Sequence, residues 1–308
     1  MITVAICTWN RANLLNQTLG RMISIHIPSG VTWELLVVNN NCTDSTESVL
    51  SYYADKLPLR SVFEPSPGQS NARNRAVHEA QGDLIIWTDD DVLVDRDWLA
   101  AYVDAAGQWP TTAFFGGPIK PWFEGAPPPW LEQIYSRVEN AFAARDLGQD
   151  PRLLTEGKFP FGANMAMRTK VQRRYLFDPK LGLRPGSRIV GEETAVFERM
   201  THDGLDGRWV PKAKVQHFIP KGRQTIKYLR SYYQGYGQLS ALKENPEEGR
   251  RLFGRPRWMW RKAIEGEMLF WLKRYCFKPE SWIDDLIQAS TCWGLLFPPI
   301  SSRTDSQC

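Results

Sequence analysis

Three consecutive carboxylates, Asp89, Asp90 and Asp91, follow a short apolar run at residues 84–87. Adjacent carboxylates repel one another, so a positively charged partner is expected beside them. Mn²⁺ or Mg²⁺ suits this position, because hard divalent cations bind carboxylate oxygens and complete their coordination with the phosphates of a substrate. The alternative is an acidic turn that caps a helix near Arg96, since aspartate is common at helix N-caps.

A second polar segment, from Pro67 to Arg75, combines a turn, a helix start and the guanidinium groups of Arg73 and Arg75. Backbone N–H groups at a helix N-terminus and a nearby guanidinium favour an anion such as a diphosphate. Two further polar segments, at residues 8–11 and 39–41, each follow an apolar run. The four segments offer ligands for a metal and a diphosphate, provided that the fold brings them together.

The elements that must position these segments alternate between strand and helix over the first hundred residues. The predicted strands are apolar runs at residues 2–7, 34–38, 59–64 and 84–87. The predicted helices cover residues 12–22, 44–53 and 70–80, and Asp44 with Glu47 matches a capping box at the start of the second. This order predicts an α/β fold with a mostly parallel central sheet, right-handed crossovers and ligands at the carboxyl ends of the strands. The four polar segments then share one edge of one sheet.

The rest of the chain has a different character. Prolines interleaved with tryptophan and phenylalanine at residues 118–130 predict a long ordered loop. A strand is expected at residues 161–167 and a helix at 194–201. Three C-terminal helices are expected at residues 225–243, 258–273 and 279–294.

The order of the motifs resembles that of family 2 glycosyltransferases with the GT-A fold. The motifs occupy residues 7–11, 37–44, 68–75 and 89–91, followed by acceptor-side motifs at 161–166 and 191–194. The resemblance implies a nucleotide-sugar-binding catalytic domain at residues 1–220 and leaves 221–308 as a helical extension for acceptor or membrane docking. It also implies an inverting, metal-dependent transfer of a sugar from a UDP-linked donor to a hydroxyl of a glycan or lipid-linked acceptor, in polysaccharide or glycoconjugate synthesis.

The resemblance further implies a role for each motif residue. The expected donor-nucleotide residues are Thr8, Asn10, Arg11, Asn39, Asn41, Arg73, Asp89 and Asp90. The expected metal ligands are Asp91, Asp89 and His217. Glu193 is the expected base that takes the proton of the acceptor hydroxyl, with Glu192 positioning the acceptor or supporting the base. The alternatives are that both glutamates favour the start of a helix near Thr194, and that His217 is a hydrogen-bonded sheet residue.

Two positions depart from the family pattern. Asn39 stands where the family commonly has aspartate, and because an amide donates as well as accepts hydrogen bonds, uridine is less firmly implied. Glu193 stands where relatives have an aspartate base, so its additional methylene places its backbone further from the acceptor.

The charge of the chain is nearly balanced, with 38 Lys and Arg against 34 Asp and Glu. Both signs are interspersed, which argues against a nucleic-acid partner. The basic excess is local, because residues 218–308 hold 15 Lys and Arg against 9 Asp and Glu. Tryptophans lie among these basic residues at positions 258, 260, 271, 282 and 293. This mixture is typical of helices at an anionic membrane interface, and the alternative is packing against the catalytic domain.

The compartment and the competing functions follow from what the sequence lacks. The first apolar run is short and without a basic leader, no run reaches the length of a membrane span, and the five cysteines are scattered. We therefore expect a cytoplasmic protein with peripheral attachment to the cytoplasmic face of the membrane. Dinucleotide and P-loop motifs do not follow any predicted strand, which leaves a nucleotidyltransferase and a non-catalytic carbohydrate- or nucleotide-binding protein as the alternatives.

Overall fold

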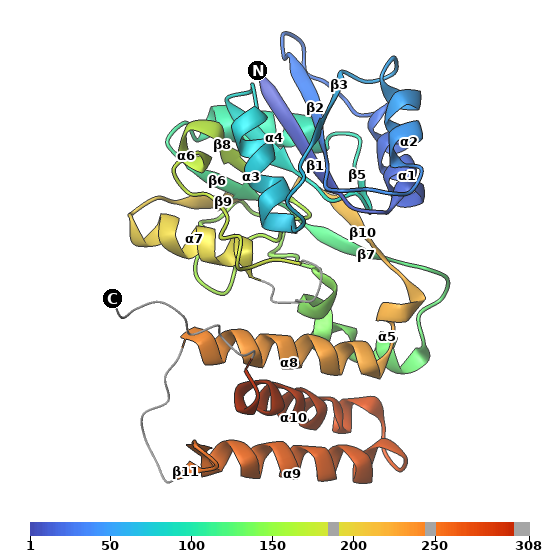
Figure 1. Cartoon of the computed structure of the whole chain (residues 1–308), viewed down its shortest axis with the longest axis vertical. Helices are drawn as coiled ribbons and strands as arrows, with labels where there is room; N and C mark the ends of the chain where they lie inside the picture. The colour runs from blue at the N-terminus through green and yellow to red at the C-terminus, as the bar shows by residue number, and fades with distance from the viewer. Residues whose placement is uncertain (184–190, 244–250, 299–308) are drawn as a thin grey trace. The chain divides into compact units, whose positions relative to one another are not determined.

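A seven-stranded sheet forms the centre of the first of two units in the computed structural model, which describes residues 1–183, 191–243 and 251–298 (Figure 1). The first unit comprises Met1–Glu124 and Phe142–Ile219. The second comprises Gly125–Ala141 and the chain from Pro220.

The central sheet has the strand order β3-β2-β1-β4-β8-β6-β9. Its strands are β1 (Ile2–Thr8), β2 (Trp33–Asn39), β3 (Leu59–Phe63), β4 (Leu84–Trp87), β6 (Phe114–Gly116), β8 (Met165–Arg168) and β9 (Gly207–Trp209). Strand β8 is antiparallel to both of its neighbours, whereas all the other neighbouring pairs are parallel. The predicted α/β class with a mostly parallel sheet is confirmed.

Helices cover both faces of this sheet because successive strand residues point to opposite sides. Val4 and Ile6 of β1 share a core with α1 (Ala12–Met22), α2 (Thr46–Tyr53) and α4 (Trp98–Gln108). Ala5 lies on the other face, in a core with α3 (Gln69–Glu79) and α7 (Glu192–His202). The short helix α6 (Thr169–Gln172) follows β8. The sheet is thus buried on both faces, and its carboxyl edge is where polar side chains collect.

Two local predictions in this unit are wrong. Helix α2 begins at Thr46, where the Asp44 carboxylate accepts hydrogen bonds from the backbone N–H and the hydroxyl of Thr46, and Glu47 bonds the Asn39 amide instead of completing a capping box. The strand expected at 161–167 is shorter, because the Asn164 N–H bonds the Phe161 carbonyl and closes a turn before β8 begins.

A second sheet, ordered β5-β10-β7, extends the first unit. It consists of β5 (Val92–Val94), β7 (Ile119–Phe123) and β10 (Val215–Ile219). The loop expected at 118–130 is therefore wrong: its first part is β7, an edge strand on which the missing N–H of Pro121 is tolerated. Pro129 begins helix α5 (Pro129–Val138), where proline suits the first turn.

The second unit is helical. Its long helices are α8 (Ile226–Lys243), α9 (Arg257–Arg274) and α10 (Ile283–Leu296). Its short elements are η1 (Glu139–Phe142), η2 (Lys221–Arg223), η3 (Pro279–Ser281), β11 (Arg251–Leu252) and β12 (Arg255–Pro256). The last residue of η1, Phe142, belongs to the first unit. Helix α10 packs between α8 and α9 (Figure 1). A Cβ at Gly294 of α10 would lie 2.1 Å from the Gln234 carbonyl oxygen of α8, so this close approach requires glycine.

The three predicted C-terminal helices are confirmed, with the third beginning at Ile283 after η3. Residues 244–250 and 299–308 of the predicted extension lie outside the described residues. Within the described ranges, every helix is too short or too polar to cross a lipid bilayer.

Candidate active site

The three aspartates lie on the loop between β4 and β5, at the carboxyl edge of the central sheet. Asp90 points inward: its carboxylate accepts hydrogen bonds from the Thr8 hydroxyl at 2.8 Å and from Arg11 Nη1 at 3.0 Å. The Thr18 hydroxyl donates to its backbone carbonyl at 3.0 Å. Burial raises the pKa of Asp90 to about 7, with Arg11 opposing the shift and Asp91 adding to it. Asp90 therefore holds the loop against β1 and α1.

Asp89, Asp91 and His217 form a cluster that could hold one metal ion. Each offers one ligand atom, and these atoms lie within 4.8 Å of one another. The antiparallel pairing of β10 with β5 sets His217 opposite Val92, so the imidazole reaches the loop that carries the aspartates. His217 Nε2 lies 3.4 Å from Asp91 Oδ1.

The orientation of the His217 ring is set by its other ring nitrogen. Nδ1 lies 3.0 Å from the Phe142 carbonyl oxygen, which can only accept, so Nδ1 carries a proton and Nε2 is the nitrogen that faces the aspartates. Two carboxylates and an imidazole nitrogen are ligands that Mn²⁺ or Mg²⁺ accepts. The chemistry of the donor set thus fits a divalent cation.

Arg11 is one of the positive groups beside the aspartates. Its Nη1 lies 2.8 Å from Asp91 Oδ2 as well as 3.0 Å from Asp90 Oδ1, and its side chain is 36% exposed. The expectation of a cation beside the triplet is met here by a guanidinium that solvent can reach.

Arg73 is the second positive group, and it is buried. Its Nη1 lies 2.9 Å from Glu192 Oε1 and 3.7 Å from Glu193 Oε2, and its Nη2 lies 3.6 Å from Asp89 Oδ1. A Cβ at Gly162 would lie 2.0 Å from Nη2, so a larger residue there would displace this guanidinium from its place beside the loop before β8. One cation on α3 therefore contacts both Asp89 of the candidate metal site and the glutamate pair.

The two glutamates occupy the first turn of α7, where the helix dipole favours negative charge. Burial raises the pKa of Glu192 to about 8, with Glu193 adding to the shift and Arg73 opposing it. Glu192 therefore keeps its proton to a higher pH than an exposed glutamate does. Glu193 is more accessible, with its side chain 15% exposed, and its Oε1 accepts a hydrogen bond from the Gly162 N–H at 3.1 Å. The alternative that both glutamates favour a helix start agrees with their place in the first turn of α7, and their catalytic roles stay predictions.

The predicted asparagines connect the loops next to this network. The Asn39 carbonyl accepts from the Cys42 N–H at 2.8 Å, and its amide donates to Glu47. The Asn10 side chain accepts from the Thr43 N–H at 2.7 Å. The Asn41 amide donates to the Pro65 carbonyl at 2.6 Å. These side chains lie at the ends of β1 and β2. Their hydrogen bonds hold the neighbouring loops in place and occupy much of their hydrogen-bonding capacity.

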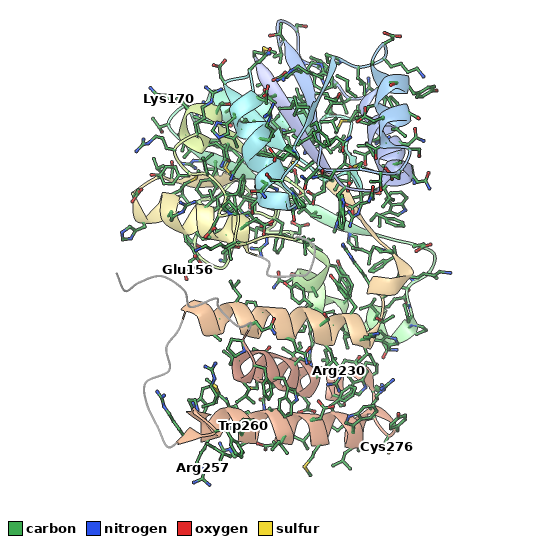
Figure 2. All side chains as sticks on the ribbon, in the orientation of Figure 1. Glu156, Lys170, Arg230, Arg257, Trp260 and Cys276 are labelled. Atoms are coloured by element: carbon green, nitrogen blue, oxygen red, sulfur yellow. The ribbon has the colours of Figure 1, made fainter. Side chains whose placement is uncertain are left out.

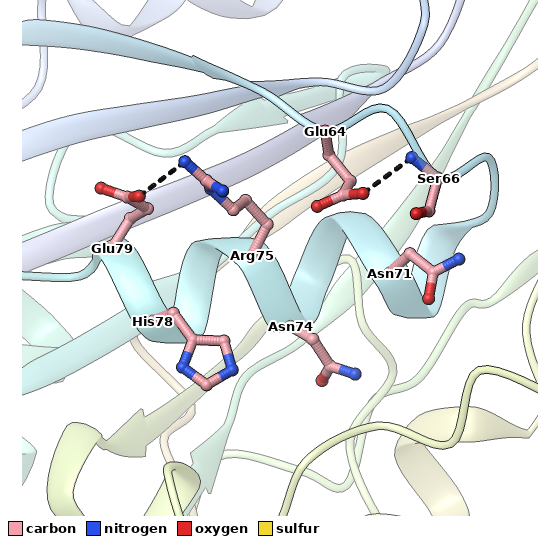
Figure 3. A pocket seen from close by; sticks show the side chains of 7 residues that line it. All are labelled: Glu64, Ser66, Asn71, Asn74, Arg75, His78 and Glu79. Atoms are coloured by element: carbon pink, nitrogen blue, oxygen red, sulfur yellow. Dashed lines mark hydrogen bonds and ion pairs between the residues drawn. The ribbon is translucent and has the colours of Figure 1, made fainter.

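Arg75 does not join Arg73 at the sheet edge. It forms an ion pair of 2.9 Å with Glu79 on the outer side of α3. There it borders a hollow of about 340 Å³, shown in Figure 3, which is lined by Glu64, Ser66, Asn71, Asn74, Arg75, His78 and Glu79. The reason is helical geometry: residues two apart point in different directions, so only Arg73 faces the site.

The structural role of Asn164, whose side chain hydrogen-bonds to four distant groups, was not predicted from the sequence. This fully buried side chain accepts from Trp98 Nε1 and the Tyr102 hydroxyl, each at 2.8 Å. Its amide donates to the carbonyls of Pro118 at 3.0 Å and Ala213 at 2.7 Å. Its place in the 161–166 motif, directly before the apolar run that begins at Met165, was the local signal, and its partners are distant in sequence.

Comparisons with known proteins identify relatives of this chain. Residues 3–176 match the model of the family described as glycosyl transferase family 2. The succinoglycan biosynthesis protein ExoM of Rhizobium meliloti is 23% identical over 248 residues, which cover 79% of this chain and 76% of that protein.

Two solved structures share the fold. The mannosyltransferase PcManGT of Pyrobaculum calidifontis, in complex with GDP-Man and Mn²⁺, has a TM-score of 0.57 and 22% identity over 79% of this chain and 64% of its own. Residues 1–349 of TarS from S. aureus, in complex with UDP-GlcNAc, have a TM-score of 0.56 and 16% identity over 94% of this chain and 81% of that one. The expected GT-A architecture is confirmed.

Proposed function

Starting from the finding that the chain belongs to glycosyl transferase family 2, we propose that this glycosyltransferase carries out a metal-dependent, inverting transfer. The donor is a nucleotide sugar, and the acceptor is a hydroxyl of a glycan or a lipid-linked glycan. The observation that carries the proposal is the continuous set of contacts from the Asp89, Asp91 and His217 cluster through Arg73 to the two glutamates.

The proposed donor side is the carboxyl edge of the central sheet. Mn²⁺ or Mg²⁺ would be held by Asp89, Asp91 and His217, and when bound it offsets the charge that develops on the departing diphosphate. Arg11 and Arg73 add positive charge beside the same phosphates. The remaining proposed donor-binding residues are Thr8, Asn10, Asn39, Asn41 and Asp90.

We propose a UDP-linked sugar as the donor. The UDP-GlcNAc complex of the TarS fragment, which aligns over 94% of this chain, supports a uridine nucleotide. The GDP-Man complex of the mannosyltransferase makes guanosine the alternative. The Asn39 side chain does not decide between uridine and guanosine, because its carbonyl oxygen already accepts a hydrogen bond from the Cys42 N–H.

The proposed acceptor side is the start of α7. Glu193 takes the proton of the attacking hydroxyl, and Glu192, held by Arg73, supports it from the interior. Attack from the side opposite the diphosphate inverts the anomeric carbon through an oxocarbenium-like transition state. The ExoM relative, named for succinoglycan biosynthesis, supports a role in polysaccharide synthesis. Residues 1–220 are the proposed catalytic domain and 221–308 the proposed docking extension.

The test is a panel of UDP- and GDP-sugars with Mn²⁺ or with chelator, read by thermal shift and by donor turnover. Asp91→Asn and His217→Ala should each raise the Mn²⁺ concentration that gives half of the metal-dependent stabilisation by at least about tenfold. Loss of a group that only hydrogen-bonds to a metal ligand already costs that much. Glu193→Gln should keep donor binding and lose turnover by about a hundredfold or more.

Asp97→Asn is the matched control, because Asp97 is 64% exposed and lies six positions after Asp91, beyond β5 and at the start of α4. It should behave as the native chain. The proposal would be contradicted if no donor stabilised the chain in a metal-dependent way. It would also be contradicted if Glu193→Gln left turnover unchanged.

A further inference from the structure

Helix α9 carries two apolar stripes, whereas a helix at the edge of a water-exposed bundle needs only one. The inner stripe consists of Met259, Ala263, Gly266 and Phe270, which are buried. The outer stripe repeats the same spacing with Ile264, Met268, Trp271 and Tyr275, which are 50%, 60%, 46% and 76% exposed. Spacings of four, three and four residues place each stripe along one side of the helix.

The inner stripe is accounted for by the second unit itself. A Cβ at Gly266 would lie 2.9 Å from the Asp285 carbonyl oxygen of α10, so this side of α9 is pressed against α10. The outer stripe therefore points away from α10. Figure 2 shows the labelled side chains of Arg257 and Cys276 on this outward side, near the two ends of α9.

The apolar surface extends beyond the stripe. Leu272 and Phe277 are 66% and 62% exposed, and a shallow hollow of about 400 Å³ lies among Glu267, Met268, Trp271 and Leu272. From Ile264 to Tyr275 the stripe is about 16 Å long at the rise of an α-helix. A continuous exposed patch of this kind marks an interaction surface.

The charges around the patch are basic. Residues 251–281 contain eight Lys and Arg against three Glu. Of these glutamates, Glu267 is paired with Arg230 by hydrogen bonds of 2.7 and 2.8 Å, so its charge is offset. Arg257, Arg261 and Lys262 precede the stripe and are exposed, and Lys278 follows it.

Cations and aromatic rings are in direct contact here. The Arg274 guanidinium lies 5.4 to 5.6 Å from the ring centroids of Phe270, Trp271 and Tyr275. Lys262 Nζ lies 5.5 Å from the ring of Trp258. Tryptophan and tyrosine beside basic side chains suit the boundary between lipid headgroups and acyl chains, where one end of each ring is apolar and the other is wet.

We propose that the outward side of α9 binds the surface of an anionic lipid bilayer, with the helix lying in the plane of the interface. Phosphate-bearing headgroups complement the basic residues at both ends of the stripe, and the apolar side chains enter the boundary region. A second copy of the chain fits less well, because two copies of α9 facing each other would bring basic ends together in either direction.

The test uses the full chain in vesicle flotation, without donor or acceptor, so its outcome is separate from that of the proposed transfer reaction. The chain should float with vesicles of phosphatidylcholine and phosphatidylglycerol, and float less with phosphatidylcholine alone or at high salt. Arg261→Ala with Lys262→Ala should weaken binding to the anionic vesicles by about fivefold for each residue removed. Met268→Glu with Leu272→Glu should weaken it more than tenfold.

The matched control is Leu153→Glu with Ile23→Glu, which adds the same two negative charges at residues of the first unit that are each 53% exposed. It should float as the native chain does. Unchanged thermal unfolding of all variants checks that they fold. Recovery of the native chain in the soluble fraction at low salt would overturn the proposal, as would flotation of the Met268 and Leu272 variant like the control. A concentration-dependent dimer abolished by that variant would assign the surface to a second copy instead.

Discussion

Arg73 Nη1 lies 2.9 Å from Glu192 Oε1, and the two side chains are only 3% and 5% exposed. The same guanidinium lies 3.6 Å from Asp89 Oδ1, so a single buried cation connects α3 to the candidate metal site and to the start of α7. A buried ion pair is weak evidence for net stability, but removal of Arg73 leaves the carboxylates of Asp89 and Glu193 without their buried counter-charge and the Glu192 carboxyl without its donor.

Replacement of that cation should therefore be strongly destabilising. Arg73→Met leaves Glu192, Glu193 and Asp89 facing one another, and we expect the free energy of unfolding to fall by about 3 to 5 kcal/mol in urea titrations. Arg75→Met, two residues further on, removes an exposed pair with Glu79 and should cost less than about 1 kcal/mol. Equal effects of the two substitutions would show that the Arg73 contacts are not formed in solution.

The pKa of Glu192 gives a prediction of pH dependence. Burial raises this pKa to about 8, above the ordinary value of about 4.3, so the folded protein binds this proton more tightly than the unfolded chain does. The corresponding stability is fully present below the ordinary pKa and is lost as pH rises through the folded pKa.

The melting temperature of the native chain, without metal or donor, should therefore fall relative to that of Glu192→Gln between about pH 5 and about pH 9. Glu156→Gln, at an exposed position, should follow the native curve throughout. Parallel curves for the native chain and the Glu192 variant would rule out a buried, protonated Glu192.

The fold and the gathering of most of these positions at one edge of the sheet could be predicted because their signals are local. Strand and helix periods depend on neighbouring residues, and parallel strands with helical crossovers place their carboxyl ends along one edge. The residues Thr8, Asp89 and Arg73 could thus be assigned to one region from their positions after strands or at a helix start.

The directions of the side chains could not be predicted, because they depend on contacts between distant segments. Asp90 points to Thr8 while its two neighbours face His217, and the residue types alone do not distinguish three aspartates, so only the family resemblance assigned Asp89 and Asp91 to the metal. Pro121 was read as a loop residue, and only its pairing with β10 at an edge makes it part of a strand.

Asn164 shows most clearly what distant contacts contribute, and it gives the last prediction. Asn164→Ala would leave the indole N–H of Trp98, the hydroxyl of Tyr102 and two backbone carbonyls without this partner in a fully buried place. Because each unsatisfied buried group costs about 1 to 3 kcal/mol, we expect the free energy of unfolding to fall by at least about 3 kcal/mol. Asn13→Ala, at an exposed position of α1, should change it by less than about 0.5 kcal/mol. A loss for Asn164→Ala no greater than that of the control would mean that water enters and replaces the amide, and would remove Asn164 as the link between α4 and the second sheet.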